Sequence, residues 1–305
     1  MLKYLAFAGA CGVGIPMGVW FLNRYPKLHA YVSFLLLFLT VKTVDINFVS
    51  REFYRGTSKG FEVSFIDLLL LSMMFYLLIY RRDTLYRRPP GTVLYILYVL
   101  GSVLSLGSSA VLLYSCFEIL KMLRMYLLFW VIYQWFRSAK HFQMMYYSMG
   151  SAMVYVFIIM LKQKYLEGMW QAKGPFPHQN SLVMYANLFN CLLFAYVLHH
   201  PQRKKSLLAL SFLFWCTGIL CTVFTFSRGG LLFLGLGLGL VLICSLHPRQ
   251  INVRKIGVLC LAGLAGLAIA IKAADSIQER FETAPEESME VRAVLAIAAL
   301  NMVKD

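Results

Sequence analysis

The residues best suited to chemistry are an arginine and two glycines in the segment TFSRGG at 225–230. This segment joins two apolar stretches with almost no loop, so Arg228 is expected at the start of a helix. Unpaired backbone N–H groups and the positive end of the helix dipole favour an anion there. Gly229 and Gly230 allow close approach of a ligand, and together with Ser227 they predict a phosphate site. The alternative is a tight hairpin in which Arg228 anchors the membrane interface.

A second segment, GPFPHQN at 174–180, leads directly into another apolar stretch. Asn180 or Ser181 is expected to cap the helix that begins there. His178 has the chemistry of a base or of a hydrogen-bond donor to phosphate. The alternative is that the whole segment serves only as a turn and a helix cap.

Charged residues inside apolar stretches also need an explanation, because a charge at mid-bilayer costs about 3 kcal/mol or more. Glu118, Lys121 and Arg124 follow one another at intervals of three and lie on about one face of a helix. One reading is an internal Glu118–Lys121 ion pair with Arg124 reaching toward the interface. The other is a basic patch for an anionic lipid headgroup, in which Arg124 is the spare cation. Lys42 and Asp45 are expected to form a simple ion pair within one helix.

The C-terminal segment carries a third candidate cation, Arg292. Val291, Leu295 and Ala298 share one face of a predicted amphipathic helix that spans 289–304. None of the helical neighbours of Arg292 at three or four positions is acidic. Arg292 is therefore either an ordinary solvated side chain or available to a ligand.

Composition indicates the elements that must position these residues. Hydrophobic residues make up 60% of the 305 residues and charged residues 14%, whereas soluble domains have about 45–50% and about 25%. A soluble enzyme, a disordered chain and a disulfide scaffold are therefore excluded, and an all-α, polytopic membrane bundle is expected. About 20 apolar residues cross a bilayer. Ten stretches are expected to do so: 4–22, 30–48, 63–80, 91–114, 116–136, 143–161, 181–198, 206–226, 229–246 and 256–274.

These stretches suggest two regions. Residues 1–161 form an N-terminal set of transmembrane helices. Residues 162–305 comprise an outer loop at 162–180, further spans to residue 274 and an extracytoplasmic tail at 275–305.

The net charge of +15 is read as an orientation signal. The loops after every odd-numbered stretch carry basic residues opposed by Asp83 alone, whereas the other acidic loop residues lie on the opposite side. Positively charged loops face the cytoplasm, so the N-terminus is expected to face outward. This accounts for most of the charge without a nucleic-acid partner.

Metal and nucleotide cofactors are not expected. Most of the seven cysteines lie in or beside apolar stretches, with no CxxC pair or zinc spacing, and are read as buried hydrophobes. The glycine repeat at 234–239 lies inside an apolar stretch, with no preceding strand, so it is not a dinucleotide loop. Gly235 and Gly239 instead fit close helix packing.

The order of these motifs resembles the O-antigen ligase / O-antigen polymerase family of bacterial envelope proteins. GPFPHQN opens a span, TFSRGG follows, and an outward tail then carries Arg292, so the resemblance covers about residues 165–305. It implies transfer of a glycan from undecaprenyl pyrophosphate to a glycan, lipid A-core or protein acceptor on the periplasmic face of the inner membrane. It also implies a reaction without metal or nucleotide sugar.

The resemblance makes Arg228 and Arg292 the two catalytic arginines that hold the pyrophosphate. The substrate-binding candidates beside them are Arg124, Lys121, His178, Asn180, Ser227, Gly229 and Gly230. The histidine that serves such enzymes as general base follows the tail helix, and this chain ends at Asp305 without it. The sequence is therefore expected to be a C-terminally truncated member that binds donor without necessarily catalysing transfer.

A second hypothesis is a transporter or flippase for a lipid-linked or anionic solute. Transporters are often built from inverted repeats with paired broken helices. No such repeat is recognised here, which favours the transferase hypothesis.

Overall fold

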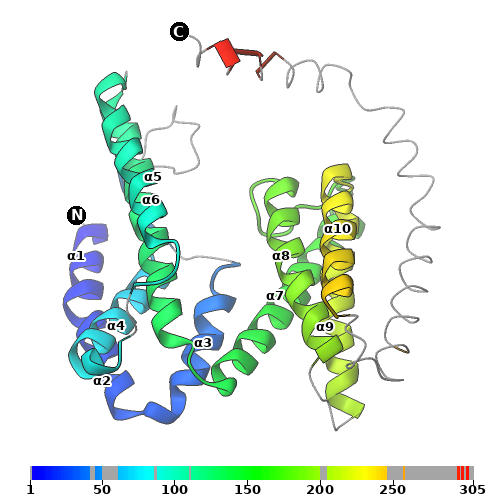
Figure 1. Cartoon of the computed structure of the whole chain (residues 1–305), viewed down its shortest axis with the longest axis horizontal. Coiled ribbons are helices and arrows are strands. Elements are labelled where there is room, and N and C mark those ends of the chain that lie inside the picture. Colours follow the sequence, from blue (N-terminus) through cyan, green and yellow to red (C-terminus); the bar gives the residue numbers. More distant parts are fainter. Residues whose placement is uncertain are drawn as a thin grey trace. The chain divides into compact units, whose positions relative to one another are not determined.

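The structure is a computed structural model of the chain. It describes residues 2–41, 45–49, 61–85, 88–109, 111–199 and 205–245, together with 257, 294, 295, 297, 298, 300 and 301. Helices dominate this part of the chain, as Figure 1 shows, and the expected helical class is confirmed in outline. The chain divides into two compact units, Met1–Ala152 and Met153–Asp305. Whether a functional boundary lies at residue 161 stays a prediction.

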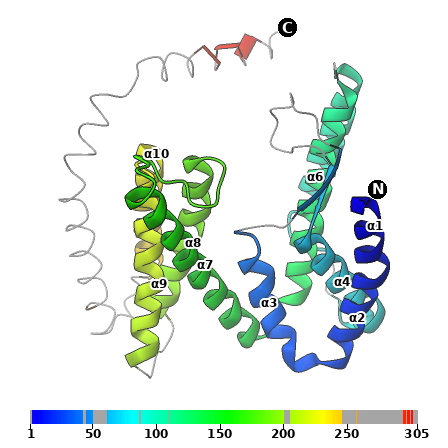
Figure 2. The same ribbon diagram turned by 180° about the vertical axis from the view of Figure 1, so that it is seen from behind.

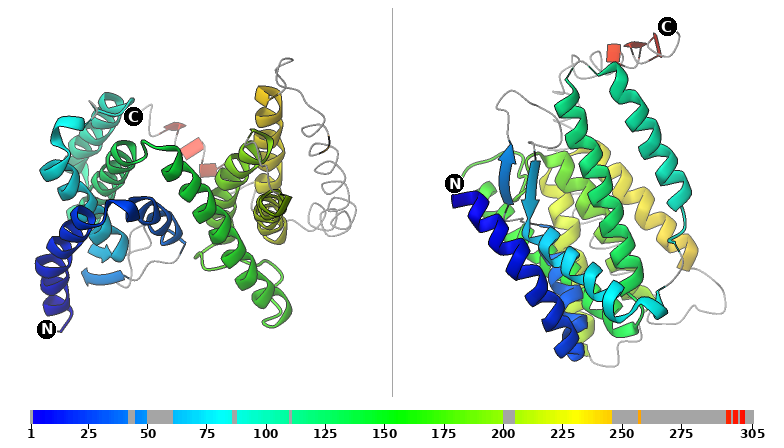
Figure 3. Two further views of the ribbon diagram at one scale, coloured as in Figure 1. Left: turned by 90° about the horizontal axis from the view of Figure 1, so that it is seen from below. Right: turned by 90° about the vertical axis from the view of Figure 1, so that its left-hand side faces the viewer.

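The first unit contains short and long helices and one pair of strands among its described residues. Its complete helices are α1 (Leu2–Gly9), η1 (Ala10–Gly14), α2 (Ile15–Arg24), η2 (Pro26–Leu28), α3 (His29–Phe38), α4 (Phe65–Tyr80), η3 (Arg82–Thr84), α5 (Thr92–Leu104), η4 (Ser105–Ser108) and α6 (Leu112–Trp135). The strands β1 (Asp45–Val49) and β2 (Phe61–Ser64) are antiparallel, with Asp45 opposite Ser64 (Figure 3).

Helix α7 (Ala139–Tyr165) starts in the first unit and continues into the second. The second unit then adds α8 (Gln179–His199), α9 (Lys205–Phe224) and α10 (Arg228–Ser245). Helix α8 packs against both α9 and α10, and the three helices lie side by side in Figures 1 and 2.

Four of the described helices are long and apolar enough to cross a bilayer: Tyr4–Arg24, Ala139–Tyr165, Gln179–His199 and Ser206–Phe224. Shorter apolar helices accompany them, among them α4 and α10. Large apolar side chains are exposed on both units, for example Leu104 at 82% and Met184 at 77%. Such a large apolar surface is unfavourable in contact with water and is suited to contact with lipid chains. A membrane-embedded chain is therefore supported, while the count of ten spans stays a prediction.

The single helix expected over 30–48 is wrong. Helix α3 ends at Phe38, and the chain enters a strand at Asp45. The Thr40 hydroxyl donates to the Leu37 carbonyl at 2.6 Å, which closes the last turn of the helix. The alternation of polar and apolar residues in DINFV at 45–49 is typical of a strand. Lys42, the predicted partner of Asp45, lies outside the described residues, so their ion pair stays a prediction.

The core of the first unit forms where α2, α3, α4 and α6 meet. Leu36, Met73 and Val131 are fully buried in it. The indole N–H of Trp135 at the end of α6 donates to the Ser33 hydroxyl of α3 at 3.0 Å. A buried indole N–H needs such a partner, so this bond fixes the relative placement of α3 and α6.

The second unit packs its helices through small residues, but not through the glycines that the sequence indicates. A Cβ atom at Gly235 or Gly239 would meet nothing within 4 Å, so the expected close packing there is wrong among the residues that the structure describes. Gly230 and Gly237 make the close approaches instead, to Val183 and Cys191 of α8. Helix rotation decides this outcome, because glycines two positions apart lie on nearly opposite faces of a helix.

A glycine substitution tests the packing of α8 on α9. A Cβ atom at Gly218 would lie 2.1 Å from the amide oxygen of the fully buried Asn190. Gly218→Ala is therefore expected to destabilise the chain by about 1–3 kcal/mol. Thermal unfolding of the purified chain in detergent measures this change.

Gly235→Ala is the matched control, because it adds the same methyl group to open space. Replacing a mid-helix glycine by alanine should stabilise the chain by about 0.5–1 kcal/mol. Equal melting temperatures for the two variants would contradict the observed helix packing.

Candidate functional site

The second unit brings the two predicted segments together at one end of its helices. The Ser227 hydroxyl, just before α10, donates to the Asn180 amide oxygen in the first turn of α8 at 3.3 Å. Asn180 is exposed and Ser227 half-buried, so a ligand can reach both side chains. This contact joins residues that belong to separate motifs in the sequence.

The start of α10 has the form expected of an anion site. The Ser227 carbonyl accepts the N–H of Leu231 at 2.9 Å, and the Ser227 hydroxyl accepts the N–H of Gly230 at 3.3 Å. Ser227 is therefore the N-cap, and the N–H groups of Arg228 and Gly229 have no acceptor within the helix. A Cβ atom at Gly229 would meet nothing within 4 Å, so no residue in the described part of the chain closes this edge to a ligand.

The two predicted catalytic arginines, Arg228 and Arg292, belong to parts of the chain that the structure does not fully describe. The side chain of Arg228 and the whole of Arg292 lie outside the described residues, although the backbone of Arg228 begins α10. The described residues of the tail, which include Leu295 and Ala298, have helical backbone. The roles predicted for both arginines stay predictions.

The turn before α10 is tightly constrained. Phe226 has a φ angle of 50°, in the left-handed region that a bulky residue rarely adopts. The ring of Phe226 stacks on the ring of Trp170, with 5.2 Å between the ring centroids and an interplanar angle of 11°. The Lys164 ammonium lies 4.5 Å and 4.7 Å from the rings of Phe224 and Phe226. These contacts hold the backbone conformation that presents Ser227 and the start of α10.

His178 caps α8, which corrects the expected cap at Asn180 or Ser181. Its carbonyl accepts the N–H of Leu182 at 3.3 Å, and its ring Nδ1 accepts the N–H of Asn180 at 3.1 Å. A backbone N–H can only donate, so Nδ1 is unprotonated and the neutral ring carries its proton on Nε2. The geometry therefore favours His178 as a hydrogen-bond donor through Nε2 rather than as a base.

Gln163 orders the loop before α8, and the sequence analysis did not identify it. Its side-chain oxygen accepts the N–H groups of Lys173 at 3.0 Å and Gly174 at 2.8 Å, and its amide N–H donates to the Gly174 carbonyl at 2.8 Å. Gly174 has a φ angle of 58°, which explains the need for glycine there. A glutamine just after an apolar stretch is the only trace of this role in the sequence.

A network of polar side chains from α8 and α9 forms a hydrogen bond with the first turn of α10. The Asn187 amide of α8 donates to the Gly230 carbonyl at 2.8 Å, and the Thr222 hydroxyl of α9 donates to the Asn187 oxygen at 3.0 Å. Asn190 then donates to Thr222 at 3.3 Å. Polar side chains between apolar helices associate in this way when no water is present. The network therefore fixes the position of the predicted anion site.

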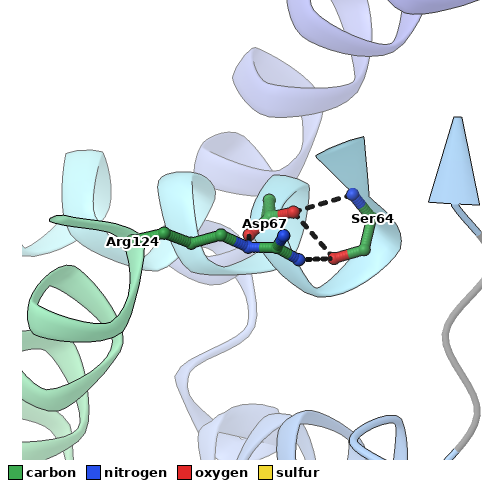
Figure 4. Close-up of polar contacts among 3 residues, drawn as sticks. All are labelled: Ser64, Asp67 and Arg124. Atoms are coloured by element: carbon green, nitrogen blue, oxygen red, sulfur yellow. Dashed lines mark hydrogen bonds and ion pairs between the residues drawn. The ribbon is translucent and has the colours of Figure 1, made fainter. Parts of the chain in front are cut away.

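The first unit holds the other two predicted cations, on α6. Arg124 is not a spare cation, because its Nε atom lies 2.5 Å from Asp67 Oδ1 at the start of α4. The Nη2 atom of Arg124 donates to the Ser64 hydroxyl at 2.7 Å (Figure 4). The Asp67 carboxylate also accepts the backbone N–H of Ser64 at 2.7 Å, which completes the N-terminal cap of α4. Spacing along one helix indicates only partners on that helix, so it does not predict this pair between α6 and α4.

Arg124 and Lys121 nevertheless share a cavity of about 580 Å³, which Asp67 also lines. Its walls are otherwise mainly apolar, with Ile66 and Leu127 among them. The ion pair expected between Glu118 and Lys121 stays a prediction, as does a substrate-binding role for Lys121 and Arg124. In the described part of the chain, no group of three or more acidic, histidine or cysteine side chains is placed to hold a metal ion.

A double-mutant cycle tests the Arg124–Asp67 ion pair. The exposed fractions of the two side chains are 35% and 13%, so water screens the pair only partly. Asp67→Asn and Arg124→Gln are expected to show a coupling free energy of about 1–3 kcal/mol. Unfolding of the single and double variants in detergent measures it.

The exposed pair of Lys162 with Glu167, at 3.1 Å, is the matched control. Its side chains are 64% and 43% exposed, and such pairs contribute about 0–1 kcal/mol. Additive effects of the Asp67 and Arg124 substitutions would contradict a structural role for their contact.

Comparison with known proteins does not identify a relative: no family model, no curated protein and no solved structure matches this chain.

Proposed function

We propose that this chain is a metal-independent membrane glycosyltransferase. Its donor is a glycan on undecaprenyl pyrophosphate, and its acceptor is a glycan, a lipid A-core or a protein at the periplasmic face of the bacterial inner membrane. The observation that supports this proposal best is the contact of Ser227 with Asn180 beside the open start of α10. This arrangement offers hydrogen-bond donors where a pyrophosphate would lie.

The proposed site suits the chemistry of the leaving group. Negative charge grows on the pyrophosphate as the glycosidic bond breaks. The N–H groups of Arg228 and Gly229, the dipole of α10 and the Arg228 guanidinium would all stabilise this charge. Groups that bind the transition state more tightly than the donor accelerate the reaction.

His178 has a positioning role in this proposal. Because Nδ1 accepts the N–H of Asn180, the ring can offer only Nε2–H to a phosphate oxygen. General-base chemistry is assigned, through the family resemblance, to a histidine beyond the tail helix. The proposal therefore assigns His178 to donor binding and not to deprotonation of the acceptor.

The orientation of the site completes the proposal. The basic loops are assigned to the cytoplasm, which places the loop before α8 and the turn before α10 at the outer face. Lipid-linked donors and acceptors for the bacterial envelope meet at that face.

Donor binding by the purified full chain tests the proposal. Arg228→Ala is expected to weaken binding of undecaprenyl pyrophosphate by about 10- to 150-fold, the range for a lost hydrogen bond to a charged group. Arg24→Ala is the control, because Arg24 ends α2 in the other unit. Binding is measured by native mass spectrometry in detergent.

Equal donor binding by wild type and Arg228→Ala would contradict the proposed pyrophosphate site. Movement of donor across vesicle membranes without glycan transfer would support the transporter hypothesis instead. The transfer assay uses the chain together with any following residues that its gene encodes.

Two substitutions of His178 separate its structural and binding roles. His178→Asn keeps a good N-cap and is expected to unfold like wild type, whereas His178→Ala should lose about 1 kcal/mol. His178→Ala should also weaken pyrophosphate binding, because it removes the Nε2–H donor, whereas His178→Asn keeps an amide N–H on a shorter side chain. Unfolding and donor binding are measured on the same samples, and full binding by His178→Ala would exclude a contact between the His178 side chain and the phosphate.

A further inference from the structure

The cavity of the first unit lies among α1, η1, β2, α4 and α6, beside Thr40 just after α3, and has a volume of about 580 Å³. Ile66, Leu70, Leu71 and Leu127 form part of its wall, so most of its surface suits an apolar ligand. Cavities of about 300–1,000 Å³ with a few polar groups are typical of small-molecule sites. This cavity belongs to a different unit from the predicted pyrophosphate site.

Among the described residues that line the cavity, basic side chains outnumber acidic ones. Arg124 is neutralised by Asp67 at 2.5 Å, and the second oxygen of Asp67 accepts from Ser64 (Figure 4). Lys121 lines the same cavity one helical turn earlier on α6. The described residues that line the cavity therefore include two basic side chains, Lys121 and Arg124, and one acidic side chain, Asp67.

We propose that this cavity binds a glycerophospholipid with an anionic headgroup, with one acyl chain inside the cavity and the phosphate on Lys121. The apolar wall would cover the chain, and the ammonium would bind the phosphate as a point charge. The exposed apolar surface of this unit, for example Leu94 at 73% and Leu104 at 82%, is suited to the bilayer that supplies such a lipid.

The apolar wall favours an acyl chain. A cavity of about 580 Å³ lies within the range of small-molecule sites, and a free phosphate ion would leave the apolar wall without a partner. The inference does not depend on the proposed glycan transfer, because none of its residues belongs to the second unit.

Lipid retention by the purified full chain tests this inference. The protein in detergent is mixed with equal amounts of phosphatidylglycerol and phosphatidylcholine, and bound lipid is counted by native mass spectrometry. Wild type should prefer phosphatidylglycerol about fivefold, the effect of one basic side chain near an anionic headgroup. Lys121→Ala should bind both lipids equally, whereas Lys121→Arg and the exposed control Lys140→Ala should keep the preference.

A second pair of variants tests the acyl chain. Leu71→Trp narrows the cavity and should reduce the binding of both lipids, whereas Leu78→Trp, on the same helix but away from the cavity, should not. Excess inorganic phosphate should leave the bound lipid in place. Equal binding of both lipids by wild type, a preference retained by Lys121→Ala, unaltered binding by Leu71→Trp or displacement by phosphate would each overturn the inference.

Discussion

Polar side chains that pair across helices are the interactions on which this structure depends, because the interior of a bilayer offers them no water. In the first unit, Arg124 of α6 binds Asp67 at the start of α4. In the second unit, Asn187 of α8 holds the Gly230 carbonyl of α10. Each contact joins the end of one helix to the side of another, so it fixes where a helix begins as well as how it packs.

The proposed pyrophosphate site follows from this constraint. The network of Asn187, Thr222 and Asn190 forms hydrogen bonds among α8, α9 and α10, and the Ser227 hydroxyl caps α10. The N–H groups of Arg228 and Gly229 have no acceptor in the helix. A site held in this way is already arranged before its ligand arrives, which is the property that electrostatic catalysis requires.

The sequence is enough to predict the helical class and the meeting of two motifs. Most of the described helices coincide with apolar stretches, because length and hydrophobicity determine which segments can cross a bilayer. The segments around His178 and Ser227 are in contact through Asn180. Three expectations were wrong for one reason: spacing along the chain shows only local partners. Arg124 finds Asp67 across the unit, the His178 ring takes the cap expected of Asn180, and the close glycine contacts occur at Gly230 and Gly237. The end of α3 at Phe38 was missed because an alternating strand pattern follows an apolar run directly.

The most direct test of the central claim is photo-crosslinking of the full chain in membranes with a photoreactive prenyl pyrophosphate whose reactive group lies next to the phosphates. The account predicts labelled peptides that contain residues 178–180 and 226–230, with labelling abolished by excess undecaprenyl pyrophosphate. Labelling confined to other segments, or labelling that undecaprenyl pyrophosphate does not reduce, would contradict it.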